Sequence, residues 1–191
     1  RTRLSAEMVR DQALAVSGLL ANRDGGPSVM PPQPDGVRAW GGFKWTAAEG
    51  PDRFRRALYT YWKRTSPYPS MLTFDAPMRD ACTTQRIATN TPLQPLVTLN
   101  DPAYLEMARS LAQKMEKAPG AGPREKIAEG YLLATQSQPS AQALDVLNQL
   151  REDLVAEYSA TGPKPLAETP DQAAMINVAS VLLNLDTAIT K

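Results

Sequence analysis

The stretch RIATNTPLQPLVTLNDPAYLEMARSLAQKM, residues 86–115, decides the fold class because it contains the start signals of two consecutive helices. The string TPLQ at 91–94 has the pattern of a capping box, with proline at the first helical position. The string DP ten residues later repeats this device with an aspartate N-cap. The stretch therefore predicts a short helix over 92–99 that turns sharply into a longer one over 102–117.

Helical signals continue on both sides of this stretch. Ser5 is placed as an N-cap, and the apolar residues after it recur at helical spacing. Thr169 begins another capping box before the string AAMINVASVLLNLDTAI. The string FRRALYTYWKR favours a helix, although alternation at 58, 60 and 62 also permits a strand. Besides the two helices above, we expect helices over 5–22, 54–64, 123–136, 140–159 and from 170 onward.

The fold class expected from these signals is all-α, with seven or eight helices and one long loop. Residues 23–51 contain too many prolines and glycines for a regular element. They also contain too many large apolar residues for a disordered linker. We therefore expect an ordered Pro/Gly-rich loop that packs over the core of a single unit spanning residues 1–191.

Composition excludes several classes of function. Hydrophobic residues make up 42% and charged residues 21%, as in ordinary globular domains, and no apolar run is long enough to cross a membrane. The net charge of +1 argues against a nucleic-acid partner. Because the chain has no histidine, it lacks Ser–His and Cys–His catalytic pairs, the common zinc sites and the Cys-x-x-Cys-His attachment of c-type haem. We expect no metal site and no cofactor in this chain.

One group of polar residues is a candidate binding site. Its members converge only if residues 76–87 form a further helix: Asp75, Arg79, Cys82, Arg86, Asn90, Asn100 and Asp101. They would then form an anion or sugar site built on the two arginines, or a buried network that ties the 66–78 loop to the 92–117 helix pair. We favour the network, in which Arg79 or Arg86 pairs with Asp75, Asp80 or Asp101. Without an imidazole to move its proton, Cys82 is expected to be a core residue rather than a nucleophile.

Several strings together resemble one family. They are RLSAEMVRDQALAVSGLL, GGPSV, RRALYTYWKRT, PSMLTFDAPMRDACTTQRIATNTPLQPLVTLND and VLLNLDTAIT. The chain resembles, from Arg1 to Lys191, the planctomycete C-terminal domain of unknown function of secreted multidomain proteins. The most specific part is F-D-x-P-x-R-x-x-C-T-x-x-R-x-x-T-N-T-P-L-Q-x-L-x-x-L-N-D, matched from Phe74 to Asp101. In that family the domain follows a cytochrome-c-like domain and a second planctomycete-specific domain.

Three departures from the family pattern stand out. Pro95 replaces the usual alanine, the loop over 37–52 is shorter and richer in glycine, and Arg1 falls where the family domain is half finished. The resemblance thus implies that the chain is the C-terminal half of a larger domain. Its partners would be the upstream half and neighbouring cytochrome-like domains, one of which carries c-type haem. The resemblance also implies a secreted or periplasmic location.

These considerations favour a non-catalytic structural or interaction module over an enzyme. The alternative is a hydrolase or binding domain acting on polysaccharide, with Asp75 and Asp101 as its carboxylates. Sugar rings would stack on aromatic residues, which more often anchor loops to a core: Trp40, Phe43, Trp45, Tyr59, Tyr61, Trp62 and Tyr68. A half domain should also expose apolar surface, and we expect Val9, Val16, Leu20 and residues 178–189 to supply it.

Overall fold

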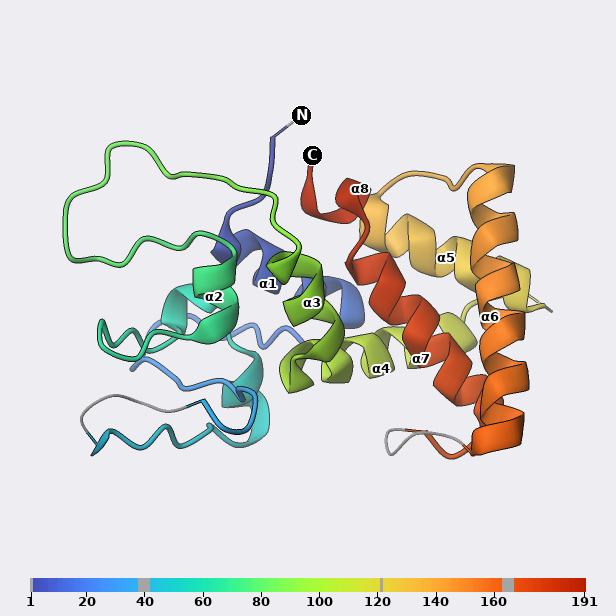
Figure 1. Cartoon of the computed structure of the whole chain (residues 1–191), viewed down its shortest axis with the longest axis horizontal. Helices are drawn as coiled ribbons and strands as arrows, with labels where there is room; N and C mark the ends of the chain where they lie inside the picture. The colour runs from blue at the N-terminus through green and yellow to red at the C-terminus, as the bar shows by residue number, and fades with distance from the viewer. Residues whose placement is uncertain (1, 38–41, 121, 163–166) are drawn as a thin grey trace.

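The computed structural model describes residues 2–37, 42–120, 122–162 and 167–191, which form eight α-helices, two short 3-10 helices and no sheet (Figure 1). The all-α prediction is confirmed. The elements are α1 (Ala6–Ser17), η2 (Gly50–Phe54), η3 (Ala57–Tyr59), α2 (Pro69–Thr73), α3 (Leu93–Asn100), α4 (Pro102–Glu116), α5 (Pro123–Thr135), α6 (Ala141–Thr161), α7 (Pro170–Leu183) and α8 (Asp186–Ile189).

Three of the expected N-caps are confirmed. The Ser5 hydroxyl accepts from the backbone N–H of Met8 at 3.4 Å, and the Asp101 carboxylate accepts from that of Ala103 at 2.8 Å. The Thr169 hydroxyl accepts at 3.2 Å from the third residue of α7. The expected helix over 5–22 ends early because Gly18 adopts a left-handed conformation with φ 80°.

The expected cap at Thr91 is wrong. Residue Pro92 holds the N-cap position of α3, and no side chain caps this helix. The Gln94 side chain points inward instead of back to Thr91. Its amide donates to the carbonyl oxygens of Thr73 at 3.0 Å and Thr89 at 3.2 Å, and its oxygen accepts from the Arg3 guanidinium. Tertiary partners therefore outcompete the local capping bond for this buried amide.

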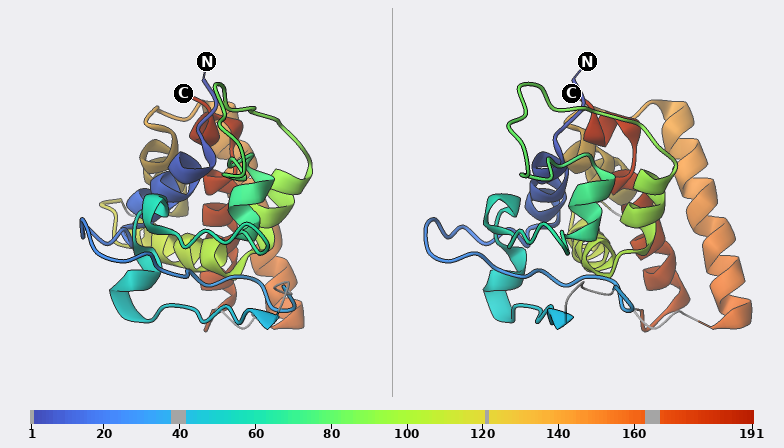
Figure 2. Two further views of the ribbon diagram at one scale, coloured as in Figure 1. Left: turned by 90° about the vertical axis from the view of Figure 1, so that its left-hand side faces the viewer. Right: turned by 60° about the vertical axis from the view of Figure 1, so that its left-hand side comes forward.

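The larger hydrophobic cluster lies among α1, α4, α5, α6 and α7. Helix α7 is central to it, because Val178 and Leu182 are fully buried there. Leu111 and Met115 of α4 and Ile127 of α5 pack into the same cluster. Helix α6 lies along the outer edge of the bundle (Figures 1 and 2).

A smaller cluster lies at the other end of α1. Ala6 and Val9 pack there with Tyr68, Met71 and Phe74 from α2 and its flanks. The segments before α1 and after α8 lie side by side, with Thr2 N–H bonded to Lys191 O at 2.5 Å and Lys191 N–H to Thr2 O at 2.9 Å. Both chain ends therefore meet above α1, as Figure 1 shows.

The long loop before α2 is ordered where it is described; Trp40 lies outside the described residues. The helix expected over 54–64 is wrong, since this segment forms η2, η3 and an extended run. The run pairs with the loop: the N–H of Val29 bonds to the oxygen of Tyr59 at 2.8 Å, and its oxygen accepts from Tyr61 at 2.7 Å. Aromatic and β-branched residues suit this extended geometry, so a tertiary partner overrides helical periodicity.

A buried arginine holds this loop in place. The Arg55 guanidinium is almost fully buried and donates to the carbonyl oxygen of Pro27 at 2.8 Å and to that of Gly25. The Cζ atom of this guanidinium lies 3.8 Å from the centre of the Tyr59 ring. Backbone carbonyls thus solvate the cation, which forms no ion pair with any of the described residues. The strings GGPSV and RRALY meet at this contact.

Candidate functional site

The residues between α2 and α3 form an irregular loop, here called the 75–92 loop, rather than the helix expected over 76–87. It arches outside the helices in Figures 1 and 2, and all its residues from 78 to 88 are exposed. Pro77 lacks a backbone donor, and the segment has too few apolar residues to bury a helical face. A helix here would therefore gain little from packing.

The two ends of the 75–92 loop are joined by one carboxylate. Asp75 accepts from the backbone N–H of Thr89 at 2.7 Å and from its hydroxyl at 2.8 Å. Asp75 itself has a left-handed backbone with φ 62°, which is uncommon for a residue other than glycine. The bonds to Thr89 hold this conformation and close the base of the loop.

The two arginines of the loop contact the body of the protein, but not through aspartates. Arg86 forms an ion pair with Glu7 of α1 at 2.6 Å, and the Arg79 guanidinium lies 5.2 Å from the centre of the Trp62 ring. The expected pairing of Arg79 or Arg86 with Asp75, Asp80 or Asp101 is wrong. Without a helix over 76–87, both side chains are directed towards α1 and Trp62 instead of the α3–α4 pair.

The remaining predicted residues are dispersed. Cys82 is an exposed free thiol on the loop, so the expectation of a core cysteine is wrong. Asn90 is exposed, and the Asn100 side chain donates to the carbonyl of Leu96 within α3 at 2.8 Å. The seven residues proposed from sequence therefore do not form one site.

Asp101 belongs to a buried polar group beneath α3. One carboxylate oxygen caps α4, whereas the other is buried without a hydrogen-bond partner in the described part of the chain. Burial raises the pKa of Asp101 above its ordinary value, although the bond from Ala103 and the charge of Arg10 oppose the increase. Arg10 is itself buried and donates to the carbonyl oxygen of Arg53 at 2.9 Å.

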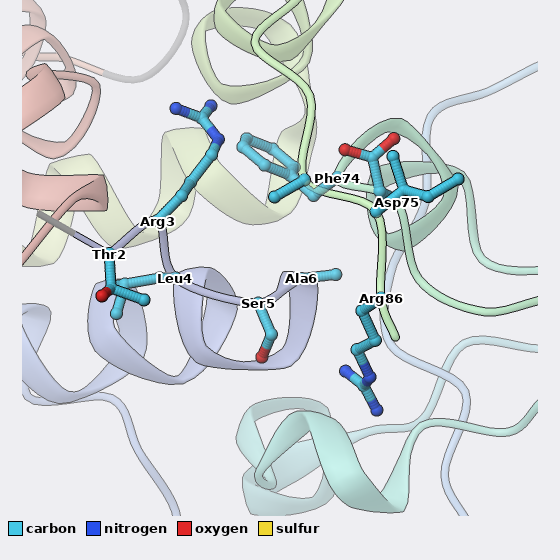
Figure 3. Close-up of a pocket in the computed structure, with 10 residues that line it drawn as sticks. Thr2, Arg3, Leu4, Ser5, Ala6, Phe74, Asp75 and Arg86 are labelled. Atoms are coloured by element: carbon cyan, nitrogen blue, oxygen red, sulfur yellow. The ribbon is translucent and has the colours of Figure 1, made fainter. Parts of the chain in front are cut away.

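Two cavities lie on either side of Arg86. The first, of about 360 Å³, lies between the segment before α1 and the loop, with Ser5, Phe74 and Asp75 in its wall (Figure 3). Figure 3 shows the Arg86 side chain directed away from Asp75. The second cavity, of about 350 Å³, is lined by Glu7, Trp62, Ala76, Pro77, Arg79, Ala81, Thr83 and Arg86.

Glu7 is the anionic group of the second cavity. Burial acts to raise the pKa of Glu7, but the hydrogen bond and charge of Arg86, together with hydrogen bonds from the Glu7 backbone and Ser5, outweigh it and leave the pKa below its ordinary value. Glu7 is therefore ionised at neutral pH, and the cavity contains two guanidinium groups and one carboxylate.

The polarity of α3 is inverted relative to an ordinary surface helix. Its buried residues are Gln94 and Thr98, 1% and 3% exposed. The Thr98 hydroxyl contacts Asn184 at the end of α7 at 2.8 Å. Leu93 and Leu96 are instead 62% and 57% exposed. This surface, with the exposed Leu99, is called the α3 face below.

Chemically, the described residues contain no group of three or more His, Cys, Asp or Glu side chains arranged to hold a metal ion. No helix among those that the structure describes is both long and apolar enough to cross a membrane. The two carboxylates considered for hydrolysis form structural hydrogen bonds instead: Asp75 closes the 75–92 loop and Asp101 caps α4.

The sequence of the chain matches the model of a known protein family. A family model described as PSD1, protein of unknown function (DUF1553), matches residues 1–151. The chain belongs to the PSD1 family. No curated protein matches it, and neither does any solved structure.

The match covers the 75–92 loop and α3 of this PSD1 chain but ends inside α6. Helix α7 lies outside it, yet α7 supplies the centre of the larger hydrophobic cluster. Sequence reasoning missed the roles of Glu7, Trp62 and Gln94, which hold the loop and α3. The inward position of Gln94 has no local signal, because Leu93 and Leu96 at helical spacing predict a buried apolar face that would direct Gln94 outward.

Proposed function

We propose that this PSD1 chain is a non-catalytic interaction module of a secreted or periplasmic multidomain protein of planctomycete type. In this proposal its partners are the upstream half of its own domain and a neighbouring cytochrome-like domain that carries c-type haem. The inverted polarity of α3 is the observation that supports an interaction role most strongly. A helix that buries glutamine and threonine while exposing leucines gains hydrophobic stabilisation only when another surface covers it.

The surroundings of the α3 face suit a protein partner. Residues 87–100 contain no charged side chain, so a partner can cover this stretch without burying an unpaired charge. Beside Leu96 lies a hollow of about 240 Å³ whose wall includes Pro34, Pro69 and Val97. A large apolar side chain of the partner would fill such a hollow, as anchor residues do in protein interfaces.

The exposed apolar surface differs in place from the sequence expectation. Val9 is buried, as are Val178 and Leu182, because α1 and α7 form the core of this chain. Three exposed leucines, Leu93, Leu96 and Leu99, instead lie together on α3, next to the 75–92 loop. The α3 face is the docking surface in this proposal, and the 75–92 loop borders it.

The proposal is tested with the double variant Leu93→Gln/Leu96→Gln and the full chain. Binding to the separately produced upstream region and cytochrome-like domain of the same parent protein is measured by calorimetry. Because both leucines would be buried in the complex, we expect affinity to fall by about tenfold or more. The thermal unfolding midpoint should stay close to that of the wild type, since both residues are exposed in the free chain.

The matched control is Leu58→Gln/Val146→Gln, which changes two residues that are each 63% exposed and lie outside the α3 face. This control should bind like the wild type. Equal affinity of both double variants, or no binding of the wild type to either domain, contradicts the proposal.

A further inference from the structure

The second cavity, between α1 and the 75–92 loop, contains uncommitted hydrogen-bond donors. Within the part of the chain that the structure describes, the Arg79 guanidinium has no hydrogen bond and no ion pair, and it lies over the Trp62 ring. Arg86 uses one terminal nitrogen to bind Glu7, and its other nitrogens have no described partner. A guanidinium presents five N–H donors, so most of the donors at this cavity are available to a ligand.

The position of Arg79 is held by the local structure. Its backbone is left-handed, with φ 60°, a conformation that costs energy for any residue with a Cβ atom. The indole N–H of Trp62 donates to the carbonyl oxygen of Met78 at 3.1 Å and so fixes the residue just before it. Strained backbone of this kind is concentrated at ligand sites. Among the described residues outside this loop, the other non-glycine residue with a left-handed backbone is Gln136. Its conformation ends α5, because Gln136 is the C-cap of that helix.

The charges of the cavity define the ligand. Two guanidinium groups and the Glu7 carboxylate give one net positive charge, which suits a ligand with a single negative charge. Paired N–H donors fit the planar carboxylate group. Glu7 repels a second negative charge but can accept hydrogen bonds from hydroxyl groups. Thr83 also lines the cavity and supplies a further hydroxyl.

We propose that this cavity binds a sugar acid. The carboxylate of the ligand accepts hydrogen bonds from Arg79 and from the free nitrogens of Arg86, and the hydroxyl groups of the ligand donate to Glu7. A volume of about 350 Å³ is sufficient for one monosaccharide unit. The proposal does not depend on the α3 face, which none of these residues belongs to.

The test titrates glucuronate and galacturonate into the full chain, with binding followed by calorimetry and by amide chemical shifts. Glucose serves as the ligand without a carboxylate. Arg79→Gln should lower the affinity for the acids by about tenfold or more through the loss of charged hydrogen bonds. Arg64→Gln is the matched control, since Arg64 is exposed and does not line the cavity.

A second variant tests the role of Glu7. Glu7→Gln removes the negative charge, so inorganic sulfate, a dianion, should bind this variant more tightly than it binds the wild type. A thermal melt of each variant establishes that it is folded.

Several outcomes overturn the proposal: no binding of either acid in the millimolar range, equal binding of glucose, or unchanged affinity in Arg79→Gln. Binding of a glutamate-containing peptide without binding of the sugar acids would also overturn it, because the carboxylate source would then be a protein.

Discussion

Asp101 shows how one side chain combines a favourable bond with an unfavourable charge. Its carboxylate caps α4, but burial raises its pKa. The folded chain therefore holds a proton on Asp101 more tightly than the unfolded chain does. Linkage then requires the contribution of this group to stability to be largest at low pH, and to fall as pH rises from the ordinary value of about 3.9 through the raised folded pKa.

We predict that Asp101→Asn keeps the cap and removes this pH dependence. Asparagine caps helices about as well as aspartate, so stability at pH 7 should be unchanged or increased. Asp101→Ala should instead cost about 1 kcal/mol through loss of the cap. Urea unfolding of the three proteins from pH 4 to pH 7 measures both effects. A large loss of stability in Asp101→Asn at pH 7 would show that Arg10 needs the negative charge.

At the scale of the element, the two capping boxes read from sequence have different outcomes. Thr169→Ala should destabilise the protein by about 1 kcal/mol, because its hydroxyl caps α7. Thr91→Ala should change stability by less than about 0.5 kcal/mol, because no side chain caps α3. Thermal unfolding of the two variants compares the same substitution at the same motif. Equal losses of stability in the two variants would contradict the observation that Thr91 does not cap α3.

Sequence alone predicted the elements whose signals are local. Ser5, Asp101 and Thr169 set helix starts through bonds within one turn, and each of these caps was found. The extended run around Thr60 could not be predicted, because its partner near Val29 is far away in sequence. The same reason applies to the candidate site. Contacts such as Arg86 with Glu7 join residues on separate elements, and no local pattern encodes them.

At the scale of the whole molecule, the segment beyond the family match is structurally necessary. Removing residues 162–191 deletes α7, including the fully buried Val178 and Leu182. Each such side chain contributes roughly 1.5–3 kcal/mol, so their sum is comparable to the total stability of a domain, about 5–15 kcal/mol. We predict that the truncated chain shows no cooperative thermal transition by circular dichroism. A control chain without only the last two residues should retain the transition. A cooperative melt of the chain without residues 162–191 would show that α7 is not needed for folding.

The paired ends of the chain have a consequence for its connectivity. Because Thr2 and Lys191 are joined by two backbone hydrogen bonds, the path of the polypeptide is nearly a closed ring. A short peptide link between them would require little rearrangement, and the exposed 75–92 loop offers a place to open new ends. A circular permutant cut near Thr83 would keep both hydrophobic clusters intact. The order in which the helices follow one another along the chain is therefore separable from the arrangement they adopt.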